Sequence, residues 1–219
     1  MKKLILKNRW FLLSYSIFFT TCIILLSIYS KPDLHILLNK ANAPFFDFFF
    51  KNITHLGDGT MIGVLGVVFL FIKFRSAIAF LLGSIPAAIV VNIFKKVLTH
   101  DMYRPSKYFE LFESYKLHLV EGVKLHSLQS FPSGHTATAF SVFLMLALVT
   151  KSNVGKLLLF FGAVVVAYSR VYISQHFMED ITVGSIISVV LMLAAFYWVQ
   201  RWHKPWLDNS VLTTHTQSK

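Results

Sequence analysis

The sequence is poor in charged residues and contains a single cysteine. Only 14% of its 219 residues are Asp, Glu, Lys or Arg, whereas soluble domains average about 25%. The low charge argues against a soluble enzyme. A hydrophobic content of 55% also argues against a disordered chain. The lone Cys22 cannot form an intramolecular disulfide, which excludes a disulfide scaffold.

Acidic residues are especially scarce. Ten Asp and Glu stand against 21 Lys and Arg, which gives a formal net charge of +11. On a soluble domain this excess would suggest nucleic-acid binding. On a membrane protein it first indicates topology signals, anionic lipid surfaces and anionic substrates. We therefore expect the lipid bilayer and an anionic substrate as partners, and no nucleic acid.

Long uncharged apolar segments take the place of the missing charge. The roughly 120 apolar residues would fill about six segments of about 20 residues, the length that crosses a bilayer. We therefore expect an all-α polytopic membrane protein with one domain over residues 1–219. The predicted spans cover residues 10–30, 60–72, 76–94, 134–149, 157–169 and 181–200, followed by a polar, frayed tail over 201–219.

The first span follows a basic N-terminus, with four Lys or Arg in nine residues. A signal peptide begins in the same way. The apolar run is longer than a signal peptide requires, however, and no small-residue cleavage site precedes Lys31, so we expect a retained span. Basic residues favour the cytoplasmic side. Six spans then leave both termini in the cytoplasm and the two long connections outside, one with an aromatic cluster over 45–50 that is typical of a membrane interface.

Three polar clusters stand at the ends of predicted spans. The first contains Lys96 and Arg104-Pro105, the second covers residues 131–135, and the third covers residues 169–180. The span count places all three at the external face. Clusters that are distant in sequence but share one membrane face predict a composite site.

The third cluster contains the most specific spacing. His176 and Asp180 are four residues apart and would be neighbours on one face of a helix. A carboxylate beside an imidazole fixes its tautomer and raises its basicity. The other ring nitrogen is then free to attack a substrate or to bind a metal.

Three cationic side chains favour the first of these two roles. The positive charges of Lys96, Arg104 and Arg170 would repel a metal ion. His135 would be the only further ligand beside His176 and Asp180, which is few for a metal site. The same cations suit a phosphoryl group, which arginine binds in a bidentate manner and lysine as a point charge. We therefore expect a phosphate site without a metal.

The second cluster resembles the opening of a helix. Either Ser133 is the N-cap or Pro132 lies in the first turn. The free N–H groups of a helix start bind anions, and Gly134 allows close approach. His135 would lie beside that anion and could protonate a leaving oxygen. Each of these residues taken alone has an ordinary structural explanation, but together on one face they indicate function.

The combined pattern resembles the type 2 phosphatidic acid phosphatase superfamily of integral membrane lipid phosphatases. Its motifs are Lys-x6-Arg-Pro, Pro-Ser-Gly-His and Ser-Arg-x5-His-x3-Asp. The second motif is complete at 132–135 and the third at 169–180. The first departs, because seven residues separate Lys96 from Arg104. Either the helix end carries an extra residue, or Lys95 reaches into the site instead.

The resemblance implies a role for each matching residue and no metal or other cofactor. His176 would be the nucleophile that forms a phosphohistidine, with Asp180 orienting it. His135 would be the general acid and then the base for water. The phosphate ligands would be Lys96, Arg104, Arg170, Ser133 and the Gly134 amide.

We therefore expect a metal-independent lipid phosphatase at the outer face of a bacterial inner membrane. Candidate substrates are undecaprenyl diphosphate, phosphatidylglycerophosphate, phosphatidic acid and lipid A phosphates. The alternatives are a lipid phosphotransferase that uses the same phosphohistidine and a non-enzymatic lipid or anion transporter. Asp58 is expected to form a turn. The remaining external histidines are expected to be solvated loop residues: His35, His55, His100, His118 and His126.

Overall fold

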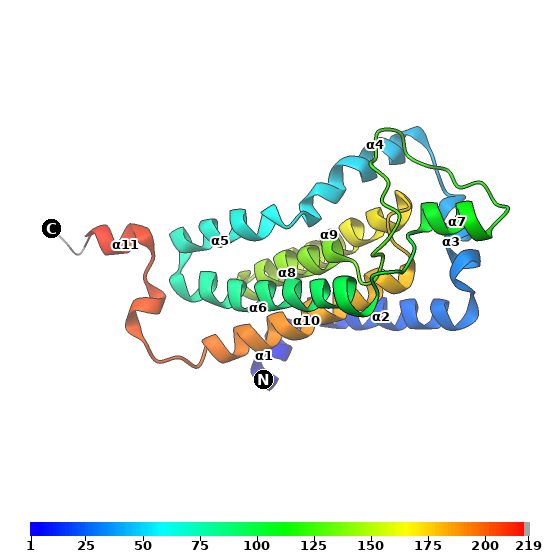
Figure 1. Cartoon of the computed structure of the whole chain (residues 1–219). Helices are drawn as coiled ribbons and strands as arrows, with labels where there is room; N and C mark the ends of the chain where they lie inside the picture. Colours follow the sequence, from blue (N-terminus) through cyan, green and yellow to red (C-terminus); the bar gives the residue numbers. More distant parts are fainter. Residues whose placement is uncertain (217–219) are drawn as a thin grey trace.

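The computed structural model describes residues 1–216, which form helices and connections with no strand among them (Figure 1). The elements in chain order are α1 (Lys2–Lys7), α2 (Arg9–Ile28), α3 (Lys31–Asn39), α4 (Pro44–Ile53), the 3-10 turn η1 (Thr54–Gly57), α5 (Thr60–Ile72), α6 (Phe74–Ile93), the π-helical turn η2 (Phe94–Leu98), α7 (Pro105–Phe112), α8 (Gly134–Val149), α9 (Asn153–Tyr172), α10 (Met178–Val199), the 3-10 turn η3 (Pro205–Asp208) and α11 (Val211–Thr216). The predicted all-α fold is confirmed.

Four helices among the described residues are long and apolar enough to cross a membrane: α2, α6 with η2, α9 and α10. A fifth candidate is a broken span, Pro44–Gly57 followed by Thr60–Ile72, with a bend of 57° between its halves. Helix α8 is apolar but shorter, at 16 residues. The chain is therefore a multi-pass membrane protein. The number of six crossings stays a prediction.

Helices α6, α8, α9 and α10 pack around a common apolar core, and α2 covers one side of it. The core includes Phe80, Phe140, Phe160 and Met192, which are almost completely buried. The outer face of α2 is different, because its large apolar side chains are exposed along the helix. Such an apolar exterior over a packed interior suits a lipid environment.

Several helices begin at residues that the sequence marks as caps. Ser30 accepts a hydrogen bond from the backbone N–H of Asp33 at the start of α3, and Ser152 accepts one from Gly155 at the start of α9. Pro105 occupies the first turn of α7, where its missing N–H costs nothing. Local sequence therefore sets where these helices start.

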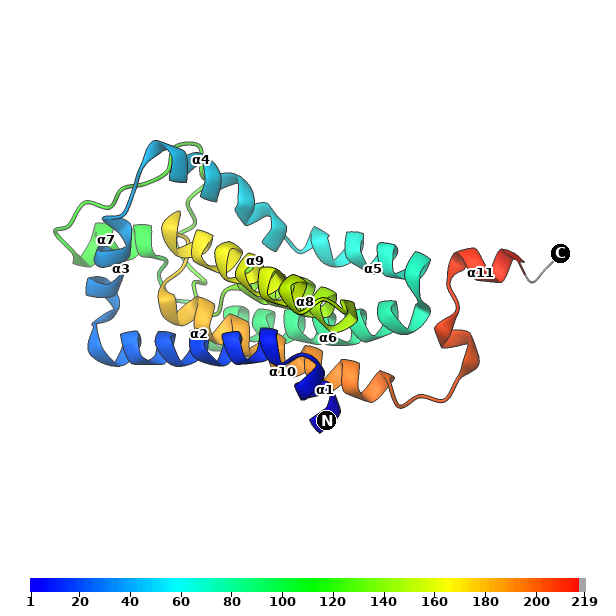
Figure 2. The ribbon, with the colours of Figure 1, turned by 180° about the vertical axis from the view of Figure 1, so that it is seen from behind.

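The long connections lie together at one end of the bundle. Helices α3, α4 and α7 and the segment 99–133 lie there, together with the start of α8, the end of α9 and the start of α10 (Figures 1 and 2). The chain's first residues lie at the other end, where Met1–Leu4 share a cavity wall with Tyr197 and Arg201. The three polar clusters thus come to one end, as the span count predicts.

The tail after α10 is more ordered than predicted. Its described part forms η3 and α11 rather than a frayed segment. Arg75 donates to both carboxylate oxygens of Asp208, at 3.1 and 2.8 Å, and to the carbonyl oxygens of Val199 and Trp202. This fork of hydrogen bonds fastens the tail to the start of α6.

Candidate active site

Direct hydrogen bonds join the three polar clusters. The backbone N–H of Ser133 donates to the carbonyl oxygen of Asp180 at 2.9 Å, which links the second cluster to the third. Arg104 Nη1 donates to the carbonyl and side-chain oxygens of Gln175, at 3.2 and 3.0 Å, which links the first to the third. Residues more than 70 positions apart in sequence therefore form one site.

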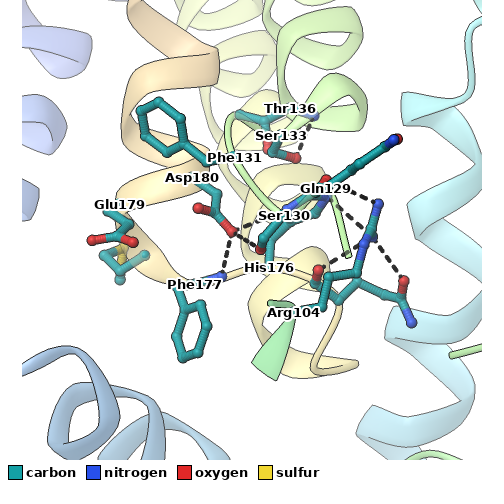
Figure 3. A network of polar contacts seen from close by, with 12 residues as sticks. Arg104, Gln129, Ser130, Phe131, Ser133, Thr136, His176, Phe177, Glu179 and Asp180 are labelled. Atoms are coloured by element: carbon teal, nitrogen blue, oxygen red, sulfur yellow. Dashed lines mark hydrogen bonds and ion pairs between the residues drawn. The ribbon is translucent and has the colours of Figure 1, made fainter. Parts of the chain in front are cut away.

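Asp180 holds His176 through a set of converging hydrogen bonds (Figure 3). Its Oδ2 lies 3.1 Å from His176 Nδ1 and accepts a bond of 2.9 Å from the backbone N–H of Phe177. The Ser130 hydroxyl donates to the same oxygen. Three donors on one buried carboxylate oxygen fix its position, and the carboxylate in turn fixes the imidazole ring.

The surroundings of His176 keep its ring neutral. Burial lowers the pKa of His176 well below its ordinary value, and the positive charges of Lys95, Arg104 and Arg170 lower it further. Because Asp180 accepts at Nδ1, the proton of the neutral ring belongs on that nitrogen. Nε2 then carries the lone pair, on the side of the ring that faces Arg104 Nη1 at 3.5 Å (Figure 3).

The two arginines are nearly buried and only partly paired. Arg104 Nε donates to the carbonyl oxygen of Leu128 at 3.0 Å, which holds the guanidinium in place. Arg170 Nη1 donates to the Thr54 hydroxyl at 2.9 Å, while its buried Nε has no partner among the described residues. A guanidinium with an unused N–H is ready to bind an oxyanion.

Helix α8 begins at the second cluster, as predicted, and its start is hydrogen-bonded to Asp180. Ser133 is the N-cap, because its Oγ accepts from the backbone N–H of Thr136 at 3.3 Å. Gly184 allows α10 to approach the start of α8 closely, since a Cβ atom at Gly184 would lie 2.5 Å from the Ser133 carbonyl oxygen. The N–H groups of the first turn of α8 thus lie at the site, where they favour an anion.

Of the two lysines that the first cluster leaves open, the structure favours Lys95. Lys96 is exposed, whereas Lys95 is half-buried and its charge acts on His176. The reason is the π-helical turn η2, in which the Thr99 N–H donates to the Phe94 carbonyl at 2.8 Å. Both lysines lie in this turn, and π turns are frequent at functional sites. We therefore assign the lysine of the site to Lys95.

His135 has a carboxylate partner that the sequence does not suggest. Its Nε2 lies 2.8 Å from Oδ1 of Asp58, the residue expected only to form a turn. His135 also lines a cavity of about 220 Å³ between α5, α6 and α8, together with Gly57, Ala87 and Gly134. The predicted acid therefore borders an open space and faces an acidic residue.

The other external histidines only partly follow expectation. His35 is buried rather than solvated, with Nε2 3.2 Å from Ser174 Oγ, and burial lowers its pKa to about 4. His118 pairs with Asp47 at 2.9 Å and helps to hold the long connection. His55, His100 and His126 are exposed, as predicted.

Four contributing residues have no motif in the sequence: Ser130, Gln175, Thr54 and Asp58. Two of them follow residues in the left-handed region, because Gln129 has φ of 60° and Ser174 has φ of 52°. Strained backbone of this kind often marks functional sites. The only sequence signal for Asp58 is its place between two glycines at the start of an apolar span. Among the described residues, no group of three or more His, Cys, Asp or Glu could hold a metal ion.

Comparisons with known proteins point in one direction. The model of the PAP2 superfamily matches residues 76–204, which include all three clusters. Among solved structures, Aquifex aeolicus LpxE is similar with a TM-score of 0.67 and 24% identity, over 78% of this chain and 96% of that one. The first transmembrane PAP2 type phosphatidylglycerolphosphate phosphatase from Bacillus subtilis has a TM-score of 0.62 and 20% identity, over 91% of this chain and 98% of that one. No curated protein matches significantly.

Proposed function

The chain belongs to the PAP2 superfamily, and on this basis we propose that it hydrolyses phosphate esters or diphosphates of membrane lipids through a phosphohistidine at His176. The observation that carries the proposal is the buried Asp180–His176 pair, with Nδ1 and Oδ2 3.1 Å apart, facing Arg104. A neutral, oriented imidazole beside cations is what attack on a phosphoryl group requires.

In the first step, His176 Nε2 attacks the phosphorus and the bond to the leaving oxygen breaks. The lone pair of Nε2 forms the new P–N bond, and Asp180 stabilises the positive charge that develops on the ring. Arg104, Arg170 and Lys95 stabilise the charge on the phosphoryl oxygens. The N–H groups at the start of α8, including that of Gly134, add hydrogen bonds to the same oxygens.

His135 supplies the proton in this scheme. As an imidazolium it donates a proton to the leaving oxygen, which departs as an alcohol or a phosphate. The neutral ring then takes a proton from water as the water attacks the phosphohistidine. The P–N bond breaks, inorganic phosphate leaves, and His135 is again protonated for the next cycle. Ser133 contributes by capping α8 and so fixing the donors of its first turn.

This scheme requires no metal or other cofactor. Its supporting argument is electrostatic, because three cationic side chains already surround the phosphate position and would repel a divalent ion. The acceptor of the phosphoryl group decides the reaction class. Water makes the protein a phosphatase, whereas a lipid hydroxyl would make it a phosphotransferase.

The substrate class follows from the membrane setting. The site lies at the end of apolar helices, so that a lipid tail could stay among the spans while its headgroup reaches His176. The four candidate substrates stand: undecaprenyl diphosphate, phosphatidylglycerophosphate, phosphatidic acid and lipid A phosphates. The similar Bacillus subtilis phosphatidylglycerolphosphate phosphatase supports the second of them. We place the site at the outer face of a bacterial inner membrane.

The test is phosphate release from these four lipids by the purified protein in detergent with EDTA present. Release from at least one lipid is expected for the wild type. His176→Ala should reduce it to background and should trap no acid-labile phosphate from a radiolabelled lipid. The exposed His100 provides the matched control, and His100→Ala should stay within about threefold of the wild type.

Three outcomes would contradict the proposal. Absence of phosphate release from every lipid would favour a binding or transport protein. Trapped phosphate on His176→Ala would mean that another residue is the nucleophile. Transfer to an added acceptor lipid in place of phosphate release would identify a phosphotransferase.

A further inference from the structure

The break between α4 and α5 forms a fourth part of the site. It lies outside the residues matched by the superfamily model. Its turn η1 packs against α8 and α9, and Figures 1 and 2 show the break lying along these helices. Thr54 in this turn accepts the hydrogen bond of Arg170 at 2.9 Å. Asp58, directly after the turn, contacts His135 at 2.8 Å. One short segment therefore touches both a phosphate ligand and the proposed acid.

We propose that Asp58 is the positioning residue for His135, so that the site contains two carboxylate–imidazole pairs with different tasks. Asp180 orients the nucleophile, and Asp58 orients the proton donor and stabilises its charged form. This inference rests on the proposed function. It adds a residue from a segment that none of the three motifs covers.

The contact itself indicates the role. Asp58 Oδ1 meets Nε2 of His135, which leaves the other ring nitrogen for the substrate oxygen. Burial disfavours the charged form of His135, and the positive charges of Arg170 and Lys95 oppose its protonation further. A carboxylate in hydrogen-bond contact counteracts them, because it favours the imidazolium over the neutral ring. Asp58 thus opposes the burial and the positive charges that disfavour the imidazolium of His135.

The backbone at Gly57 allows the turn η1 to approach His135 closely. A Cβ atom at Gly57 would lie 2.8 Å from the carbonyl oxygen of His135 and 3.0 Å from its Cβ. Only glycine lets the turn reach α8 so closely. The 57° bend then directs the chain away into α5.

The second oxygen of Asp58 reaches the surface. Oδ2 lies 2.9 Å from Nδ1 of His55, whose side chain is 69% exposed. Asp58 therefore joins a histidine at the cavity wall to one in contact with solvent. This arrangement gives the carboxylate two partners and holds it in a single orientation.

A purely structural ion pair is the competing explanation, and the leaving group separates the two. Exposed ion pairs contribute little to stability, so Asp58→Asn should leave the thermal unfolding temperature in detergent almost unchanged. An alkyl phosphate needs a proton on its leaving alkoxide, whereas the nitrophenolate of p-nitrophenyl phosphate leaves without one. The readout is the rate of phosphoenzyme formation in a single turnover with each substrate.

Asp58→Asn should slow phosphoenzyme formation from the best lipid monoester by roughly 10- to 100-fold. The burst of nitrophenol should change by less than about threefold, since that step needs no proton. In the His135→Ala background, Asp58→Asn should have no further effect on the lipid monoester, because the carboxylate acts through the imidazole. Asp58→Glu, which keeps the charge, should restore part of the loss.

Asp47→Asn is the matched control. Asp47 lies on the same broken span, away from His176, and it also pairs with a histidine, His118 of the long connection. Any loss in that variant should be equal for both substrates. An equal loss for both substrates in Asp58→Asn would overturn the proposal, as would a further loss in the His135→Ala background. If Asp58→Asn does not fold, Asp58→Ser replaces it, and failure of both to fold would show a structural role. If the wild type releases no lipid phosphate, the proposed function fails instead.

Discussion

His176 is kept neutral and oriented by different neighbours. Burial and the nearby cations lower its pKa, which keeps the ring nucleophilic at neutral pH. Asp180 fixes its direction, and three donors fix the carboxylate in turn. All three donors converge on Oδ2, whereas the buried Oδ1 has no partner among the described residues. The hydrogen bonds to Oδ2 therefore orient the ring that we propose as the nucleophile.

Substitutions of the two adjacent lysines, Lys95 and Lys96, should differ in their effect on turnover. Lys95→Ala should reduce turnover of a lipid phosphate by roughly 10- to 1000-fold, the loss expected for one charge-stabilising donor. Lys96→Ala should stay within about threefold, since Lys96 is exposed. The measurement is kcat and KM of both variants beside the wild type. A larger loss for Lys96→Ala than for Lys95→Ala would contradict the assignment of Lys95 to the site.

Irregular turns at the ends of helices, more than the helices themselves, supply the chemistry. Lys95, whose charge acts on His176, lies in the π turn η2, and the turn η1 brings Thr54 and Asp58 to Arg170 and His135. The regular parts of α6, α8, α9 and α10 form the rigid core beneath. Functional groups on irregular segments above a rigid scaffold are a common arrangement.

The contact between α10 and the start of α8 should be sensitive to a single methyl group. Gly184→Ala would place a Cβ atom 2.5 Å from the Ser133 carbonyl oxygen, so we expect destabilisation of roughly 1–3 kcal/mol. Activity should fall as well, because the donors at the start of α8 move. Thermal unfolding in detergent and phosphate release measure the two effects. Gly63→Ala on α5 is the control, since no atom lies within 4 Å of its Cβ position, and an unchanged Gly184→Ala variant would refute the tight contact.

Viewed as a whole, the molecule has an apolar exterior and two polar ends. The site lies at the end that carries α3, α4, α7 and the segment 99–133. The first residues and the tail lie toward the other end. Because the N-terminus has four basic residues in nine, the positive-inside rule predicts that this second end is cytoplasmic.

Cysteine labelling tests this orientation. In a Cys22→Ser background, Ser114→Cys in the long connection should react with a membrane-impermeant maleimide added to intact cells. Lys151→Cys, in the turn between α8 and α9, should react only after the membrane is permeabilised. Both positions are exposed in the fold, so burial does not protect either of them. The reverse pattern would place His176 on the cytoplasmic side and exclude an external substrate.

The sequence alone is enough to predict the helices, the membrane environment and most residues of the proposed site. Hydrophobic runs, the Ser133 cap and the four-residue spacing of His176 and Asp180 are local features, so they can be predicted without the fold. Only the tertiary structure decides that Lys95 rather than Lys96 faces the site, that His35 is buried, and that Asp58 reaches His135. These outcomes depend on how one helix is rotated and how closely another segment approaches it. Side chains that lie far apart in the sequence set both, so no local pattern can reveal them.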